Sequence, residues 1–127
     1  MRWTILIPVL MFLPGLGALH AQAPVKTVNA LKAFFATSCV KCHGLDGSAL
    51  GAEGKKLGGF DFTDAKKAVK ETDADMVKTI RKGLFFGITM PSFKDQLTEA
   101  DALLLVQEVL RKAEKGKVIA PSEEAPR

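Results

Sequence analysis

The sequence is poor in the residues that build disulfide frameworks and structural metal centres. Its 127 residues include two cysteines, two histidines, one tryptophan and no tyrosine. Two cysteines exclude a framework of several disulfides. The length allows one domain and no more.

Blocks of charge and long apolar runs are also missing. The 18 lysine and arginine residues stand against 14 aspartate and glutamate residues, so the net charge is a mild +4. Because the lysines are scattered along the chain, a nucleic-acid-binding patch is not expected. The apolar stretch Trp3–Leu13 is shorter than the roughly 20 residues of a membrane-spanning helix. Pro8 and Pro14 interrupt it further.

Residues 1–21 have the layout of a secretory signal peptide, with a basic start at Arg2, the apolar stretch, then helix breakers and small residues. We expect cleavage after Ala21. Cleavage after Ala23 has the better A-x-A pattern, but Pro24 would then follow the cut. An uncleaved membrane anchor is the alternative. Cleavage would export the protein to the periplasm with a net charge of +3, because Arg2 is the single charged residue removed.

Three stretches have the periodicity of amphipathic helices. The first leads into the cysteine pair. The second opens with the capping box Thr72-x-x-Asp75, and Gly83 offers its end. The third opens with the capping box Thr98-x-x-Asp101. The apolar positions are Val28, Leu31 and Phe35 in the first stretch, Val77, Ile80 and Leu84 in the second, and Leu103, Val106, Val109 and Leu110 in the third.

The segments between these helices are long. Residues 44–60 carry six glycines, which favours a wrapped loop, and residues 85–95 form a second loop around Pro91. A short helix is expected near Thr63–Lys70, and the tail from Gly116 is expected to be disordered. No stretch alternates with a period of two, so the expected fold class is all-α with three main helices. Loops this long need a surface to pack on, which a large apolar ligand would supply.

Cys39-Val40-Lys41-Cys42-His43 is a C-x-x-C-H run, the attachment pattern of heme c. On a helical turn, positions i and i+3 share a face, so the thiols of Cys39 and Cys42 can both add to the vinyl groups of one porphyrin. The next residue, His43, can then turn a neutral ring nitrogen toward the iron. We therefore expect one heme c, covalently attached through Cys39 and Cys42.

Three other interpretations of this motif explain less. A structural zinc site needs four ligands, and the exported chain would hold no further cysteine or histidine. A thioredoxin-like C-x-x-C motif lies in βαβ surroundings, which the sequence does not predict. A plain disulfide between Cys39 and Cys42 would explain neither the adjacent His43 nor the long loops.

The second iron ligand is expected to be a methionine, the usual partner of histidine where electron transfer is the task. His20 would leave with the signal peptide. Met76 lies in the first turns of a helix, where a buried methionine normally fills the core. Met90 lies in a loop directly before Pro91, and a loop can approach the iron from the face opposite His43. The predicted iron ligands are therefore His43 and Met90.

Six segments of the chain occur together in one protein family. They are Phe35, Cys39–Gly47, Leu57–Asp64, Ile80–Gly83, Met90–Phe93 and Thr98–Asp101. With them the chain resembles a class I cytochrome c domain over roughly residues 28–112. The resemblance implies the cytochrome c fold, in which helices and long loops surround one covalently bound heme. We expect this domain to span residues 22–115, with the tail 116–127 beyond it.

The chain also departs from that family. Leu31 stands eight residues before Cys39, where the family often has a glycine at the crossing of its first and last helices. The exported chain has no tryptophan or tyrosine to bond a heme propionate. The proline whose carbonyl usually orients the histidine ligand is not evident in residues 50–58. We expect another backbone carbonyl in that loop to accept a hydrogen bond from His43.

A His43–Met90 pair leaves no open iron position, so an electron carrier rather than an enzyme is expected. Redox protein partners would dock near an exposed heme edge through a small interface. The residues expected to line the heme pocket are Phe35, Leu57, Ile88, Phe93 and Leu103. The lysines able to steer an acidic partner are Lys41, Lys55, Lys56, Lys82 and Lys94.

The leading hypothesis is a soluble periplasmic electron carrier without stable membrane insertion. The same domain could instead be the heme subunit of a larger respiratory or dehydrogenase complex. A heme sensor or peroxidase-like protein would need a labile sixth ligand. A thiol oxidoreductase would leave Cys39 and Cys42 free of heme.

Overall fold

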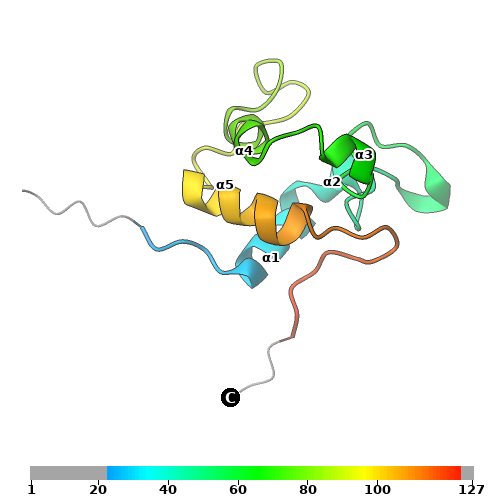
Figure 1. The fold of residues 1–127 in the computed structure, drawn as a ribbon, viewed down its shortest axis with the longest axis horizontal. Helices are drawn as coiled ribbons and strands as arrows, with labels where there is room; N and C mark the ends of the chain where they lie inside the picture. The colour runs from blue at the N-terminus through cyan, green and yellow to red at the C-terminus, as the bar shows by residue number, and fades with distance from the viewer. Residues whose placement is uncertain (1–22, 124–127) are drawn as a thin grey trace, which may run out of the picture.

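The computed structural model describes residues 23–123, and Figure 1 shows them as helices joined by long loops. The signal peptide predicted for residues 1–21 lies outside the described residues, as does the chain after Glu123. No helix within residues 23–123 is long and apolar enough to cross a membrane. The helices are α1 (Val28–Ser38), α2 (Val40–His43), η1 (Ala52–Gly54), α3 (Ala65–Ala68), α4 (Asp73–Lys82), α5 (Glu99–Leu105) and η2 (Val106–Leu110).

Three of these elements are the main helices that the sequence predicts: α1, α4 and α5, which η2 continues as a π-helical turn. The residues that the structure describes form no strand. Two isolated bridges, Leu50 with Lys56 and Leu84 with Met90, close loops instead. The predicted all-α fold class is confirmed.

A threonine begins each main helix, and its side chain accepts a hydrogen bond from a backbone N–H of the first turn. Thr27 caps α1 in this way. Thr72 accepts from the N–H of Asp75 at 3.1 Å, which confirms the predicted start of α4. Thr98 accepts from the N–H of Asp101 at 3.1 Å, and the Asp101 carboxylate accepts from the N–H of Thr98 at 3.0 Å. These contacts satisfy donors that a helix start would otherwise leave unpaired.

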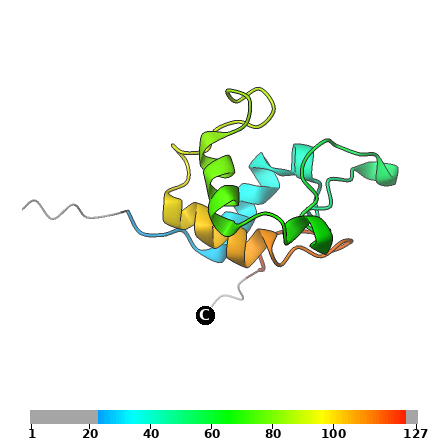
Figure 2. The same cartoon turned by 45° about the horizontal axis from the view of Figure 1, so that its top comes forward.

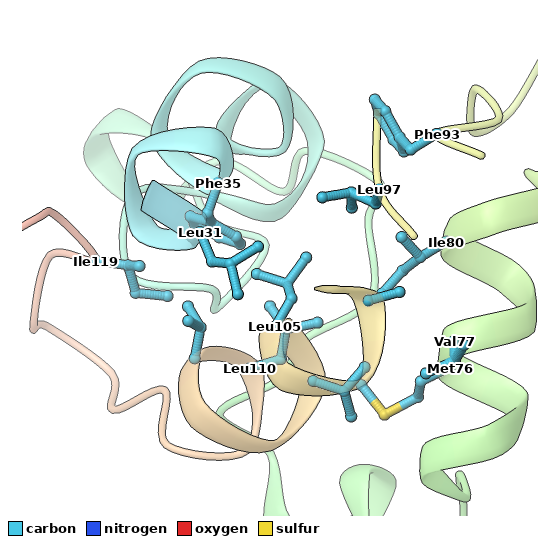
Figure 3. Close-up of a cluster of buried hydrophobic side chains, with 13 residues drawn as sticks. Leu31, Phe35, Met76, Val77, Ile80, Phe93, Leu97, Leu105, Leu110 and Ile119 are labelled. Atoms are coloured by element: carbon cyan, nitrogen blue, oxygen red, sulfur yellow. The ribbon is translucent and has the colours of Figure 1, made fainter. Parts of the chain in front are cut away.

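The α5–η2 helix is the centre of the described fold. It contacts both α1 and α4, and Figure 2 shows α4 crossing α5. Leu31 of α1 and Leu105 of α5 point toward each other in Figure 3, and both are fully buried. The other buried apolar residues of this core are Phe35, Met76, Val77, Ile80, Phe93, Leu97, Ala102, Val106, Val109, Leu110 and Ile119.

Leu103 does not belong to the buried face of the last helix, so that part of the predicted apolar face is wrong. Its side chain is 39% exposed. The buried stripe instead starts at Ala102 and continues through Leu105, Val106, Val109 and Leu110. This is the i, i+3, i+4, i+7, i+8 pattern of one helix face, and it leaves Leu103 about 100° away from Ala102 around the helix axis.

The segment after Gly116 differs from the disordered tail that the sequence predicts, because its first residues pack on the domain. The Ile119 side chain is buried, and its N–H donates to the carbonyl of Leu45 at 2.8 Å. The N–H and hydroxyl groups of Ser122 both donate to Asn29 of α1, at 3.2 and 3.0 Å. The domain therefore extends past residue 115, at least to Ser122.

Candidate functional site

A cavity of about 570 Å³ opens between α2, α4 and the loops that follow them. Its walls include all four residues that the sequence predicts as heme-binding: Cys39, Cys42 and His43 from the α1–α2 junction, and Met90 from the loop after α4. The volume falls within the 300–1,000 Å³ that is usual for small-molecule and cofactor pockets. Residues more than 45 positions apart in the sequence thus meet around one space.

A second, smaller void of about 20 Å³ lies on the core side of this region. His43 and Met90 both line it, together with the core residues Phe35, Ile80 and Phe93. The two predicted iron ligands therefore share both the main cavity and its apolar floor.

The cysteine motif forms the helical turn that its spacing predicts. Cys39 ends α1 and precedes α2. Its carbonyl accepts hydrogen bonds from the N–H groups of Cys42 and His43, at 3.2 and 3.0 Å. This i to i+3 and i to i+4 pairing closes the turn and places both cysteines at the cavity.

The two thiols are not joined by a disulfide. Burial raises the pKa of the Cys39 thiol to about 12, and the neighbouring Cys42 thiol adds to the shift. Catalytic and redox-active cysteines have lowered pKa values, because the thiolate is the nucleophile. Burial therefore favours the protonated thiol at Cys39.

The His43 ring is fixed by two contacts. Its Nδ1 atom lies 3.0 Å from the carbonyl oxygen of Phe60, and its plane stacks on the Phe62 ring with centroids 4.8 Å apart. Burial lowers the pKa of His43 below its ordinary value, and the Phe60 carbonyl opposes this shift without reversing it. The imidazole is therefore neutral, with Nε2 available as an acceptor or metal ligand.

The carbonyl partner of His43 exists as expected, but it belongs to Phe60 and not to residues 50–58. The Phe60 carbonyl can reach His43 because the preceding residue, Gly59, packs closely against α2. The Gly59 N–H donates to the Cys42 carbonyl at 3.0 Å, and a Cβ atom on Gly59 would lie 2.3 Å from that oxygen. Helical periodicity and motif spacing predict no role for Gly59 or the Phe62 ring, although the Gly58–Gly59 pair directly before Phe60 indicates a close backbone approach.

Met90 is held at the cavity by the ends of its loop. The Leu84 N–H donates to the Met90 carbonyl at 2.9 Å. A Cβ atom on Gly83 would lie 2.4 Å from the same oxygen, so this approach requires a glycine. Met76 also lines the cavity, but its side chain is buried and extends toward α5 in Figure 3.

Three of the five predicted pocket residues are where the sequence analysis expects them. Leu57 lines the main cavity, Phe35 lines the small void, and Phe93 lines both. The other two expectations are wrong. Ile88 is 87% exposed because the loop turns it outward, and Leu103 lies on the outer side of α5.

Known proteins resemble this chain in sequence and in fold. The family model described as cytochrome c oxidase, cbb3-type, subunit III matches residues 26–107. The solved structure of the KustC0563 c-type cytochrome is 31% identical with a TM-score of 0.54, over 66% of this chain and 96% of that one. A tyrosine-to-phenylalanine mutant of that cytochrome gives 29% identity and a TM-score of 0.52, over 66% and 98%. Among curated proteins, no sequence matches this chain.

These matches confirm the resemblance and the cytochrome c fold predicted from the sequence. The family model covers more than half of the chain, and its range contains the cysteine motif and the Met90 loop. Members of this family carry heme c and transfer electrons with it. The chain belongs to the c-type cytochromes.

Proposed function

We propose that this protein is a soluble periplasmic electron carrier with a single heme c, attached through Cys39 and Cys42 and ligated by His43 and Met90. The observation that carries the proposal is the convergence of these four side chains on one cavity of about 570 Å³. When bound, the heme supplies an iron that alternates between the ferrous and ferric states.

The donor set of the cavity fits such a group. The two thiols lie on one helical turn, as two thioether bonds to one porphyrin require. His43 is neutral and keeps Nε2 available, because its Nδ1 atom is engaged by Phe60. Met90 contributes a thioether sulfur from a different element of the fold. Apolar side chains such as Phe93 and Ile80 form the floor between them.

Each residue has a distinct task in this proposal. His43 and Met90 would hold the iron of the heme, so no ligand position would remain for a substrate and electron transfer would be the remaining role. The buried apolar side chains exclude water from the floor of the cavity. Surroundings of low polarity disfavour the charge of ferric heme iron and so raise its reduction potential. Lys41, Lys55 and Lys56 are exposed, and Lys41 and Lys56 directly precede the cavity residues Cys42 and Leu57, so these lysines can steer an acidic redox partner.

A heme subunit of a larger respiratory complex is the second candidate function. The description of the matching family model, which names an oxidase subunit, favours it. Purification from mildly solubilised membranes separates the two. A free carrier is recovered without other subunits after a high-salt wash of the membranes, whereas a subunit remains with a large membrane complex.

Heme retention after denaturation tests the attachment. Protein matured by a heme-attachment system should keep its heme through acid extraction under denaturing conditions, and the Cys39→Ser/Cys42→Ser variant should lose it. Free thiols and no heme absorbance in the parent protein would contradict the proposal and favour a thiol oxidoreductase. Carbon monoxide binding to the reduced parent at neutral pH would indicate an open sixth position, as in a sensor or peroxidase-like protein.

A further inference from the structure

The loop between α4 and Met90 ends in an exposed apolar tip, formed by Phe85, Phe86 and Ile88. Their side chains are 72%, 106% and 87% exposed. Single exposed apolar residues are normal on protein surfaces, but contiguous ones mark interaction sites. The other large apolar residues that the described chain exposes are spread over different elements: Val25, Leu45, Val69, Leu103 and Val118, besides Leu84 at the base of the tip.

The tip has a defined and protruding shape. Figures 1 and 2 show this loop extending away from the helices beyond the end of α4. The bridge between Leu84 and Met90 closes its neck. Phe85 and Phe86 adopt left-handed φ values of 49° and 56°, which bulky residues rarely tolerate and which cost about 1–3 kcal/mol each. The loop therefore presents its two aromatic rings at a cost in backbone strain.

Backbone hydrogen bonds within the loop hold it in a turned shape. The N–H of Gly87 donates to the Leu84 carbonyl at 3.1 Å, and the N–H of Ile88 donates to the Phe85 carbonyl at 3.1 Å. The N–H of Thr89 donates to the Leu84 carbonyl at 3.3 Å. Among the described residues, no backbone partner is present for the N–H groups of Phe85 and Phe86, so the loop suits the hydrated interfacial layer of a bilayer and not its hydrocarbon core.

Positive charge flanks the tip. Lys82 precedes the loop, Lys94 follows it, and both are exposed. No aspartate or glutamate occurs between them in the sequence, and the exposed Asp95 directly follows Lys94. Aromatic and aliphatic side chains next to lysines form the pattern by which peripheral proteins bind anionic lipid surfaces.

From these observations we infer that the apolar tip inserts into the interfacial layer of an anionic lipid bilayer, with Lys82 and Lys94 at the headgroup phosphates. A specific protein interface carries about one hydrogen bond per 100–200 Å², and the side chains of the tip can form none. A bilayer requires none. Because Thr89 and Met90 line the cavity, insertion also orients the cavity relative to the membrane. The inference rests on the exposed loop and not on which residues ligate the heme iron.

Vesicle sedimentation tests this binding with the heme-loaded, exported protein. Wild type should sediment with vesicles of phosphatidylglycerol and phosphatidylcholine, and less with phosphatidylcholine alone or at high salt. Phe85→Ser/Phe86→Ser should weaken binding at least roughly tenfold. Lys82→Ala and Lys94→Ala should each weaken it roughly fivefold. All variants carry the same N-terminus as wild type, so this end of the chain contributes equally to binding in every sample.

Val69→Ser is the matched control, because Val69 is 79% exposed on another part of the surface. It should bind as wild type does. An unchanged heme spectrum in the tip variant shows that the fold and the site are intact, which separates this test from that of the proposed function. No binding by wild type, or equal binding by the tip variant, overturns the inference. If wild type does not bind vesicles, a protein partner becomes the next candidate for contact with the apolar tip.

Discussion

The carbonyl oxygen of Phe60 lies 3.0 Å from the Nδ1 atom of His43, although 17 positions separate the two residues. With the proton on Nδ1, the imidazole donates and the carbonyl accepts. This contact fixes the ring orientation and leaves Nε2 with its lone pair, and such partners make a metal-bound histidine more basic. The geometry of the proposed iron ligand therefore depends on the backbone at residues 59–60.

Gly59→Ala should disturb His43 without changing any polar side chain. A Cβ atom there would lie 2.3 Å from the Cys42 carbonyl oxygen and 2.9 Å from His43 Nδ1, so the segment must move away from α2. Loss of the Phe60 contact makes His43 a weaker donor to iron, and we expect a higher reduction potential. Gly58→Ala is the control, because a Cβ atom there meets nothing within 4 Å. Its φ of 92° costs about 1–2 kcal/mol in stability, but the potential should stay unchanged. Equal potentials in the two variants would contradict this role of Phe60.

Gly83→Ala should displace Met90, whereas Gly87→Ala should not. Both glycines have left-handed φ values, 74° and 82°, so both variants carry similar backbone strain. A Cβ atom on Gly83 would lie 2.4 Å from the Met90 carbonyl oxygen, but one on Gly87 meets its nearest atom at 4.0 Å. The weak ferric band that reports a methionine sulfur–iron bond should therefore fade in Gly83→Ala alone. Its persistence in both variants would show that the loop neck does not hold Met90.

Asp101 should make stability depend on pH. The buried carboxylate accepts hydrogen bonds from the N–H groups of Lys26 and Thr98, at 2.7 and 3.0 Å. Burial works toward a higher pKa of Asp101, but these bonds together hold it below the ordinary 3.8. Because the folded-state pKa is lowered, the stabilisation is complete above the unfolded value and is lost as pH falls through the folded one. Asp101→Asn should lower the free energy of unfolding by about 1–3 kcal/mol near neutral pH. In urea titrations the difference in free energy of unfolding between Asp101→Asn and wild type should narrow below pH 3.8. A difference that does not change with pH would refute this account.

Ile119→Ala should show that the segment after Gly116 belongs to the fold. The Ile119 side chain is buried in the main core, and removing such an aliphatic group costs about 2–5 kcal/mol. Val118→Ala, at a neighbouring position that is 58% exposed, should change the free energy of unfolding by less than about 0.5 kcal/mol. A negligible effect of Ile119→Ala in thermal or urea unfolding would instead favour the disordered tail that the sequence predicts.

Features encoded by neighbouring residues could be predicted from the sequence. The capping threonines Thr72 and Thr98 act on N–H groups three residues away, so their patterns are local. The turn from Cys39 to His43 is also local, and its spacing alone placed both thiols on one face. The fold class followed from helical periodicity and from the absence of period-two alternation.

Contacts between segments that lie far apart in the sequence could not be predicted from local patterns. The Phe60 carbonyl reaches His43 through the approach of Gly59 to Cys42, which no spacing rule encodes. Ile119 finds its partner Leu45 across most of the chain. Three consecutive leucines, 103–105, left the phase of the last helix ambiguous, and packing against α1 and α4 decided it in favour of Leu105.

Ligation of the heme iron by Met90 is tested most directly by the optical spectrum of the oxidised, heme-loaded protein. The ferric methionine–iron band should be present in wild type and absent in Met90→Ala. It should persist in Met76→Leu, a volume-conserving change at the other methionine that lines the cavity. This pattern, with heme still bound after denaturation, is what a His43–Met90 electron carrier predicts. Absence of the band from wild type, or its loss in Met76→Leu alone, would contradict the assignment.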